Sequence, residues 1–179
     1  MNFASIASII VLILSMAGCN RDEVSSKPAT TKAELPPGLL LTAAPSDERS
    51  VTHIRASAKD GDLVTVGGWV GGSAEPIAEN RAIFTLVDQS LPSCSATEGD
   101  ECPTPWDSCC EPPETIAAKS LTVQVVDAGG SPLRTGLRGA GGLDPMREVV
   151  VTGKLHLSPD GKAGTIDASG LHVMTSSVK

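Results

Sequence analysis

The chain has 179 residues, 21 of them acidic and 14 basic, and a formal net charge of −7. This sign argues against a protein that binds nucleic acid by neutralising phosphates. With no Tyr, two Phe and two Trp, the chain also lacks most of the platforms on which bases or sugars stack. Once a targeting segment and a linker are subtracted, the length allows one domain of ordinary size.

The N-terminal residues 1–18 have the pattern of an export signal, with no charge over residues 3–18 and an apolar run from Ile9 to Leu14 that is short for a membrane span. The run leads into Ser15-Met16-Ala17-Gly18-Cys19, which resembles the lipobox of bacterial lipoproteins, although Met replaces the usual Leu and no basic residue precedes the run. The resemblance implies lipidation of Cys19, with palmitate-type chains, and export to the periplasmic or cell-surface face of a bacterial membrane. The alternative is a plain secretory signal or an uncleaved anchor.

Residues 19–49 are rich in Ser, Thr, Lys, Glu and Pro, a composition typical of a flexible tether. The apolar patch Leu39-Leu40-Leu41 interrupts this tether and could dock on the domain that follows, residues 50–179. At the start of that domain, Ser50 as N-cap and Gly61 as terminator predict a helix of two or three turns that covers one end of a sheet.

Five later segments alternate apolar and polar residues as strands do. They cover residues 62–72, 81–88, 120–127, 148–157 and 165–174. The turn Ser158-Pro159-Asp160-Gly161 predicts that the last two form a hairpin. This layout predicts an all-β fold, a five-stranded OB-fold-like barrel with a short N-terminal helix and a Cys-rich insertion over residues 89–119.

The strand sequences VTVGGWV, AIFTLVD and LTVQVV resemble the first three strands of the OB domains that include the anticodon-binding domains of aminoacyl-tRNA synthetases. The resemblance covers roughly Asp62 to Val173 and implies the fold. It does not extend to tRNA binding, because no cluster of aromatic and basic residues marks a binding face. Residues 129–147 replace the usual helix before the fourth strand and are too glycine-rich for a regular helix. As a whole, the chain also resembles uncharacterised bacterial lipoproteins that carry a CPTPWDxCC segment.

Four of the five cysteines lie in the segment CSATEGDECPTPWDSCC, as Cys94, Cys102, Cys109 and Cys110. In an oxidising compartment, an even number of closely spaced cysteines predicts a disulfide framework. Because a bond between Cys109 and Cys110 would strain the peptide that joins them, we expect Cys94 and Cys102 each to pair with one of the adjacent two. Which pairs with which stays open.

The same four thiolates could instead enclose zinc or a cuprous ion, with Asp107 and Glu111 as oxygen donors, or handle haem as OB-fold periplasmic haem chaperones do. The spacing argues against zinc, because structural zinc prefers C-x₂₋₄-C knuckles and two adjacent cysteines rarely direct both sulfurs to one centre. Thiol-disulfide exchange would need a C-x-x-C motif, which is absent. His156 and His172 are a weaker metal candidate, if they share the outer face of the last hairpin.

The sequence contains no H-E-x-x-H, G-x-S-x-G or G-x-x-x-x-G-K-[ST] motif. We therefore expect a non-catalytic binding module that needs no cofactor. The candidate partner-binding residues are Trp106 and Asp107 in the insert, and Arg134 and Arg138 in the glycine-rich connection. Trp106 either packs the insert onto the barrel or anchors a partner. The expected partners are the membrane, through the lipid anchor, and a protein or another envelope component, but not nucleic acid.

Overall fold

The computed structural model describes residues 34–96, 99 and 101–177, so the predicted signal, Cys19 and most of the predicted tether lie outside the described residues. In the described part of the chain, no helix is long and apolar enough to cross a membrane.

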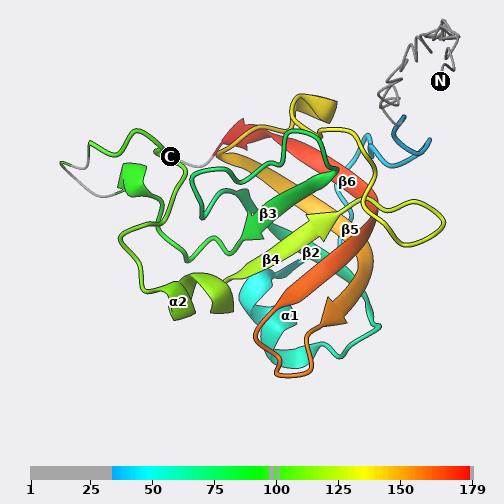
Figure 1. The fold of residues 1–179 in the computed structure, drawn as a ribbon, viewed down its shortest axis with the longest axis horizontal. Helices are drawn as coiled ribbons and strands as arrows, with labels where there is room; N and C mark the ends of the chain where they lie inside the picture. Colours follow the sequence, from blue (N-terminus) through cyan, green and yellow to red (C-terminus); the bar gives the residue numbers. More distant parts are fainter. Residues whose placement is uncertain (1–33, 97–98, 100, 178–179) are drawn as a thin grey trace, which may run out of the picture.

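The order of elements along the chain confirms the predicted all-β class (Figure 1). The elements are β1 (Arg49–Ser50), α1 (Val51–Ser57), β2 (Leu63–Val70), β3 (Ile83–Val87), α2 (Pro113–Ala118), β4 (Ser120–Gln124), β5 (Arg147–Leu157) and β6 (Gly164–Ser177), with short 3-10 turns at Cys94–Ala96 and Ala140–Gly142. Each of the five predicted strands is present, as β2 to β6. The two-residue β1 pairs in parallel with β2 and was not expected.

The five main strands form a closed barrel in the order β2-β3-β4-β6-β5, and β5 pairs back onto β2. The contact between β4 and β6 is parallel, whereas all other contacts around the barrel are antiparallel. This is the Greek-key strand order of an OB-fold, in which the third and fifth strands lie side by side. The OB-like prediction is therefore confirmed by the sheet itself.

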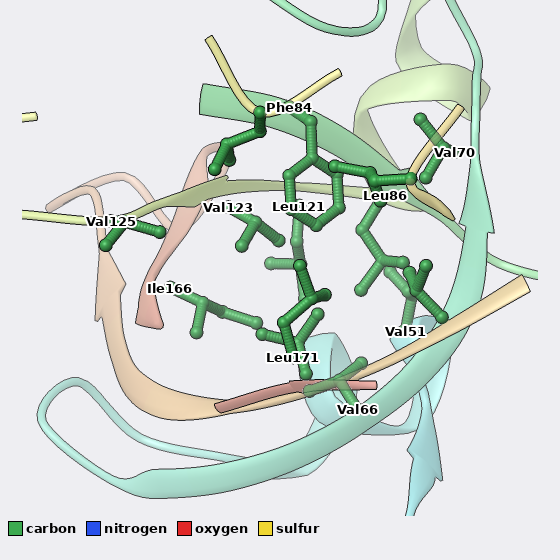
Figure 2. Packing of buried hydrophobic residues seen from close by; sticks show 14 of the residues in the cluster. Val51, Val66, Val70, Phe84, Leu86, Leu121, Val123, Val125, Ile166 and Leu171 are labelled. Carbon is green, nitrogen blue, oxygen red and sulfur yellow. The ribbon is translucent and has the colours of Figure 1, made fainter. Parts of the chain in front are cut away.

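Alternate residues of each strand point into the barrel and form one hydrophobic core (Figure 2). Phe84 and Leu86 of β3 meet Leu121 and Val123 of β4 inside the barrel, and each of the four is at most 1% exposed. The predicted alternation is confirmed, because a residue period of two is what places one side of a strand in the core.

Helix α1 packs its apolar side against the core, and it begins where the sequence predicts. The Ser50 hydroxyl accepts a hydrogen bond from the His53 N–H (3.2 Å), which is the geometry of an N-cap. Val51 and Ile54 are buried in the core. A second acceptor comes from the barrel, because the buried carboxylate of Asp88, just after β3, accepts from the Thr52 N–H (2.7 Å). Asp88 thus fixes α1 to the end of β3.

The segment before α1 is part of the fold. Leu39 is 2% exposed and lies in the core, and its carbonyl accepts from the Leu171 N–H (2.7 Å) while the Leu41 N–H donates to the Leu171 carbonyl (2.8 Å). The expected docking of the Leu39-Leu40-Leu41 patch is confirmed. The folded part described by the structure therefore begins before Ser50, within the range where the composition indicated a tether.

Helix α2 lies in the insert and was not expected. Its sequence carries the start signals of a helix, since Pro113 stands at its first position and Glu114 in its first turn. Ile116 of this helix packs with a second hydrophobic cluster, formed by Trp69, Val87 and Leu91. The insert, drawn in green on the left of Figure 1, is thus joined to the barrel by apolar contacts.

Candidate functional site

Backbone hydrogen bonds join the two arms of the cysteine insert. The Cys94 N–H donates to the Asp107 carbonyl (2.7 Å), and the Ser95 N–H donates to the Pro105 carbonyl (3.1 Å). One residue further on, the buried Ser108 hydroxyl donates to the Pro92 carbonyl (2.8 Å). These hydrogen bonds hold the two arms of the insert together.

None of the four cysteines of the insert is disulfide-bonded in the structure, which differs from the predicted pair of disulfides. The Sγ atoms of Cys94 and Cys109 are 3.4 Å apart, whereas a disulfide needs about 2.05 Å. Cys94 and Cys109, one of the pairs that the sequence left open, are nevertheless in contact through their sulfurs. The sulfur of Cys102 lies within 4.8 Å of both of them.

Three sulfurs thus form one thiol cluster, defined here as Cys94, Cys102 and Cys109, whose Sγ atoms all lie within 4.8 Å of one another. Cys94 is buried, Cys102 is half-buried and Cys109 is exposed. Of the two adjacent cysteines only Cys109 belongs to this cluster, which agrees with the expectation that neighbouring cysteines rarely direct both sulfurs to one centre. The cluster runs from the interior of the insert to solvent.

The three thiols differ in acidity because their surroundings differ. Burial raises the pKa of the Cys94 thiol to about 12. Hydrogen bonds with the side chain and backbone of Thr104 lower the pKa of Cys102, whose sulfur lies 3.3 Å from the Thr104 hydroxyl. A hydrogen bond with Cys94 lowers the pKa of Cys109, but desolvation and the neighbouring Cys102 outweigh it and raise the pKa overall. The pKa of Cys102 is thus shifted in the opposite direction to the pKa values of Cys94 and Cys109.

Trp106 fastens the insert to the barrel. Its indole N–H donates to the Ala74 carbonyl (3.0 Å) in the connection between β2 and β3, and its half-buried ring packs against the cluster that contains the buried Trp69. The Gly72 N–H in turn donates to the Trp106 carbonyl (2.9 Å). This confirms the packing interpretation of Trp106 and leaves part of its ring at the surface. The Asp107 carboxylate accepts from the Ser108 N–H (2.7 Å).

The long connection between β4 and β5 carries the two predicted arginines. Both are exposed, but Arg138 forms an ion pair with Asp144 (3.0 Å) within the same connection. The connection also lies directly on the one between β2 and β3, because a Cβ on Gly136 would come within 2.3 Å of the Glu79 carbonyl oxygen. The expectation that this stretch is not a regular helix is confirmed, since only a short 3-10 turn forms in it.

A surface hollow of about 330 Å³ lies where these two connections meet. It is lined by Ala74, Glu75, Ile77, Ala78 and Glu79 of the β2–β3 connection and by Arg138. Two other hollows, of about 170 and 430 Å³, lie beside β1 and beside α1. Of these three hollows, only the one of about 330 Å³ combines a predicted partner-binding residue, Arg138, with the loop between the first two barrel strands. That loop is a usual binding element of OB-folds.

The predicted histidine pair is not formed. In the ladder of β5 and β6, His172 pairs with Val150 while His156 pairs with Thr165, so six residues of β5, or about 20 Å, separate them. His156 instead contacts the Asp167 carboxylate (3.0 Å), which also accepts from the Gln124 side chain (2.7 Å). This three-strand polar link was missed because strand pairing, and not sequence spacing, creates it.

No protein-family model and no curated protein sequence matches this chain. Among solved structures, the chain is similar to one titled "Structure of the hypothetical protein ygiW from E. coli.". That likeness has 13% sequence identity and a TM-score of 0.37, and it covers 70% of this chain and 88% of the Escherichia coli chain. The OB-like description of this chain accordingly rests on its own strand order, and its function on its own surface.

Proposed function

We propose that this protein is an exported, lipid-anchored lipoprotein whose OB-like barrel is a non-catalytic binding module for a protein or another envelope component. The observation that carries the proposal is the hollow between the β2–β3 connection and Arg138, with Trp106 bonded to the same connection. A rigid barrel that presents adjoining loops is a common way to build a binding surface. Glu75, Glu79 and Arg138 give this surface charges of both signs, which suits a polar partner.

Site-specific photocrosslinking in the native cell tests the binding surface. A photoreactive residue at Glu75 or Arg138 should give the same discrete adduct, because both positions line the hollow. The matched control is a photoreactive residue at Lys162, which is exposed in the turn between β5 and β6. An adduct of equal yield from Lys162, or none from the two hollow positions, would contradict the proposal.

Anchoring is tested separately through Cys19. The Cys19→Ser variant should move from the membrane pellet to the soluble fraction, because it lacks the thiol that would carry the lipid. Met16→Leu, which brings the segment closer to the family pattern, should remain in the pellet. Retention of the Cys19→Ser protein in the membrane after a high-salt wash would show that another segment anchors the chain.

A further inference from the structure

We propose that Cys94, Cys102 and Cys109 form a binding site for one thiophilic d¹⁰ cation, Cu(I) or Zn(II). The site is distinct from the hollow proposed above as the partner-binding surface, since none of the three cysteines lines that hollow.

The spacing of the three sulfurs fits a single ion at their centre. Zinc–sulfur bonds are about 2.3 Å long, so two thiolates on one tetrahedral ion lie about 3.8 Å apart. The cluster has all its sulfurs within 4.8 Å of one another, with 3.4 Å between Cys94 and Cys109. A disulfide would join two of these sulfurs and leave the third thiol without a role, whereas one metal ion can bind all three.

The ligands approach from separate parts of a preformed frame. Cys94 begins the 3-10 turn on one arm, and Cys109 follows the buried Ser108 on the other arm. Hydrogen bonds between the arms, such as that from the Cys94 N–H to the Asp107 carbonyl, fix the distance between these two ligands. Cys102 completes the set from the intervening loop, where its sulfur contacts the Thr104 hydroxyl. Such outer contacts orient a metal ligand.

The chemistry of the donors selects the class of ion. Three sulfurs are soft ligands, which favour Cu(I) and Zn(II) over Mg²⁺, Ca²⁺ or Mn²⁺. Three thiolates suffice for a trigonal Cu(I) ion, and Zn(II) would add one water, as in sites with three protein ligands. Binding forms three metal–sulfur bonds and breaks three S–H bonds, and the three protons pass to solvent. The exposed Cys109 gives the ion a path to enter and leave.

The test uses the full-length protein, isolated anaerobically from the cell envelope in detergent. Native mass spectrometry should show one Zn(II) or one Cu(I) per chain, either as isolated or after adding Zn(II) or Cu(I) without prior reduction. The bound ion should protect Cys94, Cys102 and Cys109 from alkylation, and a chelator should remove that protection. Uptake of only one of the two metals identifies the ion that the site selects.

Serine variants assign the ligands. Cys94→Ser, Cys102→Ser and Cys109→Ser should each lose the stoichiometric ion, whereas Cys110→Ser, changed in the same way one residue along the chain, should keep it. Circular dichroism and thermal melting of each variant show whether the barrel remains folded. Because a variant that fails to fold reports nothing on ligation, alkylation protection in the unmodified protein is the deciding measurement in that case.

Three results would overturn the proposal. The first is an isolated protein with a denatured mass about 4 Da below the reduced mass, which indicates two disulfides, and with no bound ion. Metal uptake that begins only after chemical reduction of such disulfides belongs to this result. The second is free thiols that take up neither Zn(II) nor Cu(I). The third is a folded Cys109→Ser variant that retains the ion at full occupancy.

Discussion

Asp88 joins the end of β3 to the start of α1, and its replacement by asparagine tests how much this single carboxylate stabilises the barrel. Its two oxygens accept from the backbone N–H groups of Thr52 (2.7 Å) and Ser90 (3.0 Å), and the side chain is 3% exposed. Asn has only one carbonyl oxygen, so one of these two part-buried N–H groups would face another donor. An unsatisfied buried donor costs about 1–3 kcal/mol, and loss of the negative charge at a helix N-terminus costs about 0.3–1 kcal/mol. We expect Asp88→Asn to lower the free energy of unfolding by about 1–4 kcal/mol.

The stabilising effect of Asp88 should depend on pH. Burial alone would raise the pKa of this carboxyl, but the hydrogen bonds from Thr52 and Ser90 outweigh burial and lower the pKa below the ordinary value of 3.8. In acid, the unfolded chain therefore binds the proton before the folded chain does. The stability that Asp88 contributes should be fully present above about pH 5 and should be lost as the pH falls below 3.8 toward the folded pKa.

The assay is urea unfolding of both proteins between pH 3 and 7 in the presence of a reductant. Trp69 fluorescence reports the transition, because its buried indole donates to the Asp88 carbonyl (3.2 Å). Asp160→Asn is the matched control, since hydrogen bonds from Ser158 and Lys162 lower the pKa of this exposed carboxyl too. The control should unfold close to the wild type. A difference between wild type and Asp88→Asn that is below 1 kcal/mol, or equally large at pH 3 and pH 7, would refute the reasoning.

Two further predictions test the packing around the barrel, both by urea unfolding. Leu39→Ala should lower the free energy of unfolding by about 2–5 kcal/mol, because Leu39 is buried in the core. Leu40→Ala should lower it little, because Leu40 is 41% exposed. Equal effects would show that the segment before α1 does not dock on the barrel. Gly153→Ala should destabilise strongly, since its Cβ would come within 2.3 Å of the Asp167 carbonyl oxygen. The atoms nearest to a Cβ on Gly67 belong to the movable Glu48 side chain, so Gly67→Ala should lower the stability only slightly. An equally small effect of Gly153→Ala would contradict the close approach of β5 and β6.

The barrel could be predicted from the sequence because its signals are local. Alternation of apolar residues located β2 to β6, and the Ser158-Pro159-Asp160-Gly161 turn placed β5 beside β6. The docking of the segment before α1 could be predicted only in part. Leu39 contacts Leu171 far along the chain, while its Ser- and Pro-rich surroundings are typical of a tether. Composition describes the average of a segment, and a single docked side chain does not change that average.

The thiol cluster lay beyond sequence reasoning for a different reason. The spacing of the cysteines showed that four thiols could form disulfides or bind a metal. Which sulfurs come together depends on the hydrogen bonds between the two arms of the insert, such as that from the Ser95 N–H to the Pro105 carbonyl. Those bonds join backbone groups, which leave no mark in the sequence. The start signals of α2, by contrast, were present in Pro113 and Glu114 and were overlooked in a proline-rich stretch.

The position of β6 has a consequence for when the chain can fold. This last strand separates β4 from β5 and pairs with both, so neither has its full set of partners until residues 164–177 are available. Pairing of β2 with β5 is likewise distant in sequence, and non-local contacts of this kind make folding slow. A chain still being synthesised therefore presents two unpaired strand edges, which invite association with other chains.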